Sequence, residues 1–121
     1  MQFMLCFRET DPELARRANA EAPAYWGAWN AYIGAMRDAG IIVSGNALEA
    51  PHTGAVVRVQ DGQRQVADGP FADSKEALGG YFIVEVADLD AALTWAARSP
   101  AAAAGSVEVR PVLAMSAPPQ P

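Results

Sequence analysis

The chain is poor in the residues that most often build metal centres and nucleophilic sites. Its 121 residues include one cysteine, Cys6, and one histidine, His52. One cysteine excludes an internal disulfide and leaves no thiolate cluster for zinc, and one histidine is a weak basis for any metal site. Cys6 lies in an apolar run, which indicates a buried thiol, whereas His52 lies in a loop with proline and glycine, which indicates a solvated imidazole.

Basic side chains are also scarce. Nine Lys and Arg residues stand against 14 Asp and Glu residues, which gives a net charge of −5. This charge repels phosphate backbones and anionic headgroups, so neither nucleic acid nor a membrane is expected as a partner. No run approaches the roughly 20 apolar residues that cross a bilayer. Residues 2–8 are typical of a strand rather than of the basic start of a secretory signal, so we expect a cytoplasmic location.

Cofactor fingerprints are missing as well. The sequence has no glycine-rich phosphate loop, no dinucleotide motif and no Ser/His/Asp order, so any enzymatic activity is expected to need no cofactor. Hydrophobic residues make up 51% of the chain, enough for one compact core. We expect a single domain over residues 1–113 and a proline-rich flexible tail over residues 114–121.

The first half of the chain predicts a strand followed by two helices. Thr10 with Glu13 forms a capping box, and Asp11 followed by a proline is an alternative helix start, for a short helix that reaches about residue 19. A longer helix is expected over residues 23–39, ended by Gly40. Its predicted buried stripe has apolar residues at three- and four-residue intervals: Trp26, Trp29, Ile33 and Met36.

The second half predicts strands, one hairpin and one further helix. Strands are expected over residues 41–49, 55–60, 63–67, 81–86 and 106–113, and Asp61-Gly62 is a tight-turn signal that joins the second of these to the third. Asp88 caps a helix over residues 89–98, with inward positions at Leu89, Leu93 and either Ala96 or Ala97. This order matches an α+β, ferredoxin-like split βαβ sandwich, with helices on one face of an antiparallel sheet.

Strand alternation separates the two faces of that sheet. If the apolar positions of each strand face the helices, the opposite face carries a mixed polar set: Arg58, Tyr81, Glu85, Glu108 and Arg110. Such a mixture suits a partly covered surface.

The most specific segment is Asp68-Gly-Pro-Phe-Ala-Asp-Ser-Lys-Glu76. Aspartate, glycine and proline in this order favour a rigid turn. Asp73 with Glu76 would cap one helical turn ended by Gly79. The segment is therefore either a well-capped loop or a site in which a rigid turn holds Asp68 near a second carboxylate and Lys75, an arrangement that separates the pKa values of acid and base groups.

This segment resembles the DGPF branch of the YCII-related family. The resemblance extends over nearly the whole chain and is strongest from residue 68 onward, in Asp68-Gly-Pro-Phe, Lys75-Glu76, Leu78-Gly-Gly-Tyr81, the Asp88-Leu-Asp90 helix start and Gly105-Ser-Val-Glu-Val-Arg-Pro111. It implies a ferredoxin-like fold that dimerises through its sheets into a dimeric α+β barrel. Some members of the wider family are lyase-type or dehalogenating enzymes, and many members of this branch are encoded beside alternative sigma factors.

Two hypotheses follow from the residues and the resemblance together. The first is a homodimer that binds a small polar or aromatic molecule in a cleft near the Asp68 loop, with cofactor-free acid–base chemistry of lyase or isomerase type. Asp68 is then the candidate general acid or base, and the candidate binding residues are Trp26, Arg58, Lys75 and Glu76. The second is a non-catalytic accessory protein that acts through protein contacts, with a sigma factor as the expected partner.

Overall fold

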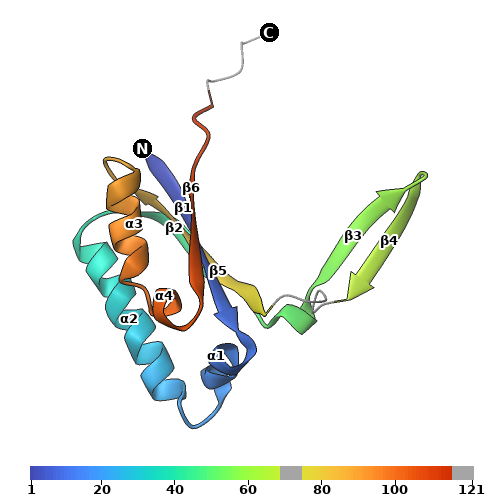
Figure 1. Cartoon of the computed structure of the whole chain (residues 1–121), viewed down its shortest axis with the longest axis horizontal. Helices are drawn as coiled ribbons and strands as arrows, with labels where there is room; N and C mark the ends of the chain where they lie inside the picture. Colours follow the sequence, from blue (N-terminus) through green and yellow to red (C-terminus); the bar gives the residue numbers. More distant parts are fainter. Residues whose placement is uncertain (69–74, 116–121) are drawn as a thin grey trace.

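The main layer of the molecule is a four-stranded antiparallel sheet with helices on one face (Figure 1). The computed structural model describes residues 1–68 and 75–115. The sheet order is β2-β5-β1-β6, with bounds Ile42–Ala47, Glu76–Glu85, Gln2–Thr10 and Ser106–Pro111. The helical segments are α1 Asp11–Ala15, η1 Arg16–Ala18, α2 Ala22–Asp38, η2 Pro51–Thr53, α3 Leu89–Ala97 and α4 Pro100–Ala104. The expected ferredoxin-like fold is confirmed.

Local signals fix most of the element boundaries. The Thr10 hydroxyl accepts a hydrogen bond from the Glu13 backbone N–H, so the first of the two predicted helix starts is the one used. Gly40 follows α2 with a φ of 70°, a conformation that glycine adopts without steric cost. The Asp88 carboxylate caps α3 through the Ala91 N–H. A short helix that the sequence analysis did not predict, α4, begins after Ser99, whose hydroxyl accepts from the Ala102 N–H.

The core lies between the helix-facing side of the sheet and α2, α3 and α4. Alternate residues of β1 are buried, and the central aromatic Phe7 meets Trp29 edge to face with 4.9 Å between ring centroids. The buried core residues are Phe3, Leu5, Phe7, Tyr25, Trp29, Tyr32, Met36, Val84, Ala92, Ala96 and Ala101.

Two predicted helix faces were right only in part: Trp29 and Met36 of α2 and Ala96 of α3 are buried as expected. In α2 the buried residues include Tyr25 and Tyr32, whereas Trp26 is 38% exposed. In α3 the predicted inward residues Leu89 and Leu93 are exposed, and Ala92 is buried beside Ala96. Small alanines on the inner face let α3 approach the sheet closely, and the leucines then point outward.

The hairpin is separate from the main sheet, which corrects the predicted position of Arg58. Strands β3 (Ala55–Gln60) and β4 (Gln63–Asp68) form their own two-stranded sheet, joined by Asp61 and Gly62 at φ values of 53° and 74°. Figure 1 shows this hairpin projecting from the body on the side away from the helices. The predicted hairpin and turn are therefore confirmed, but Arg58 does not lie on the main sheet.

The segment after the hairpin also differs from the prediction. Glu76 to Gly79 belong to β5, where an extended backbone pairs with β1, so the predicted helical turn over these residues was wrong. Its proposed cap, Asp73, lies outside the described residues, as does the rest of the segment 69–74.

Candidate functional site: a cavity between the long helix and the sheet

Two glycines of β5 create a hollow under the first half of α2. Phe7 of β1 pairs with Gly80, and the next pair is Arg8 with Leu78, so Gly79 forms a bulge. A Cβ on Gly79 would lie 2.1 Å from the Glu9 Oε2 atom, and a Cβ on Gly80 would lie 2.9 Å from the Asn46 carbonyl oxygen. Both positions therefore require a residue without a side chain.

The hollow is a cavity of about 90 Å³ between α2 and strands β1, β2 and β5. This is room for several water molecules or one small organic molecule. Aromatic rings supply much of the wall, and amides and a buried ion pair supply the polar groups. The lining residues are Phe7, Glu9, Arg17, Tyr25, Trp26, Trp29, Asn30, Ile33, Asn46, Ala47, Gly79, Gly80, Tyr81 and Phe82.

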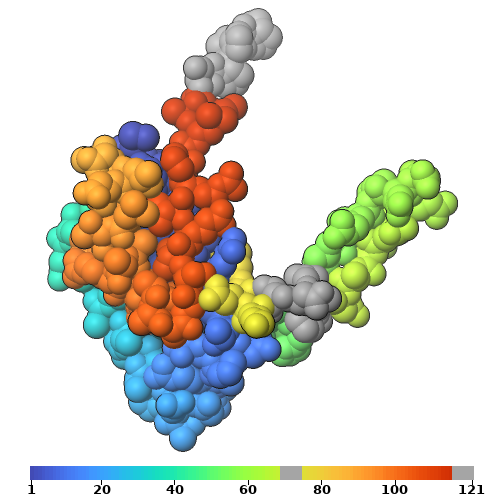
Figure 2. All heavy atoms as spheres, in the orientation of Figure 1, coloured from blue at the N-terminus to red at the C-terminus, as the bar shows by residue number. Residues whose placement is uncertain are grey.

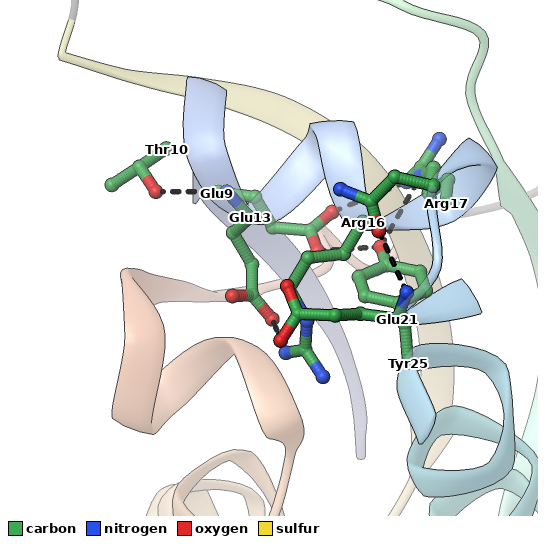
Figure 3. A network of polar contacts seen from close by, with 8 residues as sticks. Glu9, Thr10, Glu13, Arg16, Arg17, Glu21 and Tyr25 are labelled. Atoms are coloured by element: carbon green, nitrogen blue, oxygen red, sulfur yellow. Dashed lines mark hydrogen bonds and ion pairs between the residues drawn. The ribbon is translucent and has the colours of Figure 1, made fainter. Parts of the chain in front are cut away.

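A buried carboxylate holds the polar end of the cavity together (Figure 3). Glu9 is 1% exposed, and its Oε1 accepts a hydrogen bond of 2.6 Å from the Tyr25 hydroxyl. Its Oε2 accepts from the Arg17 Nη2 at 3.1 Å, in an ion pair whose arginine side chain is 18% exposed. The negative charge is thus paired and hydrogen-bonded, as burial requires.

Arg17 connects four segments of the chain. Besides Glu9, it donates from Nε to the Tyr25 hydroxyl at 2.9 Å, from Nη1 to the Leu48 carbonyl at 2.6 Å and from Nη2 to the Gly79 carbonyl at 3.0 Å. These four bonds use four of its five N–H groups and leave one on Nη1. Arginine is suited to this role because its planar fork keeps a fixed geometry.

The same arginine positions the aromatic wall. Its backbone carbonyl accepts a hydrogen bond of 3.2 Å from the Trp26 indole N–H, and its guanidinium lies 5.5 Å from the Trp26 ring centroid. Trp26 also meets Tyr25 edge to face at 4.9 Å. The partly exposed Trp26 ring is therefore held as a fixed wall of the cavity.

The Tyr25 hydroxyl stays protonated at neutral pH. Burial, together with the hydrogen bond to the Glu9 carboxylate, raises the pKa of Tyr25 to about 12. A protonated hydroxyl can donate to Glu9 and accept from Arg17 at the same time, so the direction of both bonds is defined.

The residues proposed from the sequence fall into two groups. Trp26 lines the cavity. Asp68 and Arg58 are exposed on the hairpin, Lys75 is exposed just before β5, and none of the three is among the lining residues. Glu76 is also outside the cavity lining, and its carboxylate accepts a hydrogen bond of 2.5 Å from the Ser106 hydroxyl.

Glu9, Arg17 and Tyr25 were not among the site residues predicted from the sequence. A signal for Glu9 was present, because it continues the alternation of Phe3, Leu5 and Phe7 onto the buried face of β1. A carboxylate at a buried position requires a cation or several donors. Which of the nearby arginines supplies them depends on how α1 and η1 fold back, and strand alternation does not determine that.

The described residues offer no place for a metal ion in this region. Over residues 1–68 and 75–115 no three His, Cys, Asp or Glu side chains are grouped closely enough to hold one. His52 is exposed in η2 and is not among the cavity-lining residues. Among the helices in the same part of the chain, none combines the length and apolar character needed to span a bilayer.

Comparison with known families supports the fold derived above. The YCII-related domain matches residues 1–116. The chain belongs to the YCII-related family. Among curated proteins, an uncharacterized protein of Rhizobium meliloti (strain 1021) is 44% identical over 60 residues. The match covers 48% of this chain and 48% of that relative, so the chain spans about half of the relative's length.

Among solved structures, a similar chain is 5-chloro-2-hydroxyhydroquinone dehydrochlorinase from Burkholderia phenoliruptrix AC1100, in complex with 2,5-dihydroxybenzoquinone. The TM-score is 0.56 at 17% sequence identity, with 93% of this chain and 94% of the other covered. At this identity the likeness shows that the two chains share a fold, and it does not identify functional residues.

Proposed function

We propose that this YCII-related protein binds a small aromatic or polar organic molecule in the cavity under α2 and acts on it by cofactor-free acid–base chemistry of lyase or isomerase type. The observation that carries the proposal is the cavity itself, with aromatic walls around a buried Glu9 carboxylate that is held by Arg17 and Tyr25. A mostly apolar concavity with a few convergent polar groups is the usual form of a small-molecule site.

The aromatic lining of the cavity supports a flat ligand. Trp26 from α2 and Phe82 from β5 supply ring surfaces, and the bare backbone of Gly80 supplies part of the floor. Asn30 from α2 and Asn46 from β2 are exposed amides among the lining residues. Amides both donate and accept hydrogen bonds, so they suit hydroxyl or oxo substituents on a ring.

Glu9 supports the acid–base part of the proposal. Its two oxygens each accept one hydrogen bond within the network, whereas a carboxylate has about four acceptor positions. A ligand hydroxyl placed beside Glu9 can thus donate to a carboxylate that is already oriented by Tyr25 and Arg17. Asp68 remains a second candidate acid or base, for which the exposed end of β4 would have to approach a bound ligand.

A related fold gives the chemical class to test first. The similar dehydrochlorinase is described in complex with 2,5-dihydroxybenzoquinone. Because the likeness shows the fold alone, we use that class only to choose probes: dihydroxybenzoquinones, hydroxyhydroquinones and simple hydroxybenzoates.

The test is calorimetric titration of these probes into three forms of the protein. We expect at least one probe to bind the wild type and to lose at least tenfold in affinity in Ala47→Phe, because Ala47 lines the cavity and a ring there would fill it. Ala31→Phe adds the same ring at an exposed position of α2 outside the lining and should bind as the wild type does.

Two results would count against this function. Equal binding to Ala47→Phe and the wild type would move the ligand out of the cavity, and no binding by any probe would favour the accessory role. For a probe that is bound and turned over, Asp68→Asn and Glu9→Gln then separate the two candidate acid–base groups. The substitution that lowers kcat with little change in KM identifies the group that acts in the transition state.

A further inference from the structure

One side chain of the cavity wall carries a hydrogen-bond donor that the chain itself does not use. The indole Nε1–H of Trp29 is buried, and within residues 1–68 and 75–115 no acceptor meets it. Trp29 is 7% exposed and is one of the cavity-lining residues. Most buried polar groups are hydrogen-bonded, so a buried donor without a partner calls for an explanation. Trp26 shows the usual case, because its indole N–H donates to the Arg17 carbonyl.

The surroundings of Trp29 offer only weak alternative partners. Its ring meets Phe7 and Tyr32 edge to face, with 4.9 Å and 5.9 Å between centroids. An aromatic face is a weaker acceptor than a carbonyl oxygen. The Tyr32 hydroxyl is directed elsewhere, because it donates to the Trp95 carbonyl at 3.0 Å. In Figure 2 the helices α2, α3 and α4 form one closely packed body. The cavity is the open space that Trp29 borders, so an acceptor placed there is the simplest partner.

Helix and strand spacing place Trp29 one level away from the Glu9 carboxylate. Tyr25 and Trp29 are four residues apart on α2, so they share one face and lie about 6 Å apart along the helix axis. Phe7 and Glu9 are alternate residues of β1 and share its buried face. Glu9 meets Tyr25, and Phe7 meets Trp29, so the deep wall has two neighbouring levels. This separation is close to the span of a substituted six-membered ring.

The exposed polar groups of the cavity should contribute less to selectivity. Asn30 and Asn46 are exposed, so water satisfies their amides before a ligand binds, and exchange of one hydrogen bond for another gains little. At the deep end Glu9 has unused acceptor positions and Trp29 has an unused donor. A site with buried polar groups rejects molecules that leave those groups unpaired. The deep pair should therefore decide which molecule binds.

The group that accepts from Trp29 should be neutral. Glu9 is paired with Arg17, and four of the five N–H groups of that arginine are already engaged. A second anion beside this ion pair would be buried without a cation of its own, which is unfavourable. A carbonyl oxygen accepts an N–H hydrogen bond without that cost.

We propose that the Trp29 indole N–H donates a hydrogen bond to a neutral carbonyl oxygen of the ligand, while a hydroxyl on the opposite side of the ligand ring donates to Glu9. The inference rests on the proposed function, because it concerns the same cavity. It narrows the ligand to planar ring compounds that carry one hydroxyl and one neutral carbonyl group. Trp29 is then a specificity-determining residue.

Calorimetric titration of three para-substituted phenols tests the selectivity. In mildly acidic buffer, where the phenol groups are protonated, 4-hydroxybenzaldehyde carries a neutral acceptor, 4-methylphenol carries none and 4-hydroxybenzoate carries an anionic one. We expect the wild type to bind the aldehyde about tenfold more tightly than either of the others, which corresponds to one neutral hydrogen bond. In Trp29→Phe this preference should disappear, with 4-methylphenol bound within about threefold of its wild-type affinity. Trp95→Phe removes an indole outside the cavity lining and should keep the preference.

Proton NMR of the indole N–H groups gives a second measurement that needs no Trp29 variant for binding. The chain has three tryptophans, so loss of one signal in Trp26→Phe and of another in Trp95→Phe leaves the third as Trp29. We expect 4-hydroxybenzaldehyde to move the Trp29 signal downfield, as hydrogen bonding does, and 4-methylphenol to move it much less.

The outcomes separate this inference from the proposed function. Equal affinity for the aldehyde and 4-methylphenol, or a preference that persists in Trp29→Phe, would overturn the role of Trp29. If Ala47→Phe still abolished that binding, the cavity would remain the ligand site. No binding by any of the three phenols would also overturn this inference, and the proposed function would fall only if the probes named for it failed as well.

Discussion

Two regions differ in how many independent contacts hold each residue. One is the Glu9 junction, which comprises Glu9, Arg17 and Tyr25. The other is the hairpin of β3 and β4, residues 55–68, which we call the arm. At the junction one arginine bonds to a carboxylate, a hydroxyl and two backbone carbonyls from separate segments. In the arm the cross-strand pairs of β3 and β4 are the contacts that hold the strands. The junction is therefore held by contacts between several segments, whereas the arm depends on its own cross-strand pairs.

This difference predicts where substitutions affect the whole fold. At the junction, removal of one group leaves others buried without partners, which is costly. In the arm, a substitution is expected to change local pairing and to leave the core intact. The following predictions compare the two regions, from the largest expected effect to the smallest.

Glu9→Ala should cause the largest loss of stability. It leaves the mostly buried Arg17 without its carboxylate and the Tyr25 hydroxyl without its acceptor. Breaking a buried ion pair from one side costs about 3 kcal/mol. Chemical denaturation should show this loss, and Glu49→Ala, at an exposed position, should stay within about 0.5 kcal/mol of the wild type. A loss below about 1 kcal/mol for Glu9→Ala would mean that the junction does not hold the fold.

Gly79→Ala and Gly27→Ala should change stability in opposite directions. The Cβ on residue 79 would lie 2.1 Å from Glu9 Oε2, whereas a Cβ on residue 27 meets no atom within 4 Å. We expect the first change to cost about 2 kcal/mol through overpacking and the second to gain about 0.5 kcal/mol, because alanine is the better helix residue. Midpoints of urea unfolding measure both. A Gly79→Ala protein as stable as the wild type would contradict the close approach of Glu9 to the bulge.

The sequence predicted the ends of the helices better than their buried faces. Thr10, Gly40 and Asp88 set helix ends through contacts within a few residues, so the order of elements was predictable. The exposed position of Trp26 was not, because helical spacing fits Tyr25 and Trp26 almost equally well, and packing against β1 selects Tyr25.

The arm illustrates a different limit of sequence analysis. Asp61-Gly62 encodes the turn locally, and alternation encodes which side of the hairpin is apolar. Neither signal says whether the hairpin joins the main sheet or forms a sheet of its own, because the strand pattern is the same in both cases. The predicted position of Arg58 on the main sheet was wrong for this reason.

Tyr25→Phe should change how stability depends on alkaline pH. The folded-state pKa of Tyr25, about 12, lies above the ordinary tyrosine value of 10.0, so the unfolded chain loses this proton first as the pH rises. The contribution of Tyr25 is present in full below pH 10 and is lost as the pH rises toward 12. At neutral pH the loss of the hydroxyl should cost about 1.5 kcal/mol, and above pH 10 the variant should lose stability less steeply than the wild type. If the stability of the variant and that of the wild type fell in parallel above pH 10, Tyr25 would not be a source of the alkaline pH dependence. Tyr32→Phe is the comparison variant, because burial raises the pKa of the Tyr32 hydroxyl as well.

Gly40→Ala and Gly62→Ala make the smallest and most direct comparison of body and arm. Both glycines have positive φ, at 70° and 74°, and neither has an atom within 4 Å of an added Cβ, so the change tests backbone strain alone. That strain is about 1 kcal/mol per residue. In Gly40→Ala it should lower the free energy of global unfolding, because Gly40 follows α2 of the body. In Gly62→Ala amide hydrogen exchange should speed up in residues 55–68 and stay unchanged in β1, because the strain falls on a unit that opens by itself. Faster exchange in β1 of the Gly62→Ala protein would show that the arm and the body unfold together.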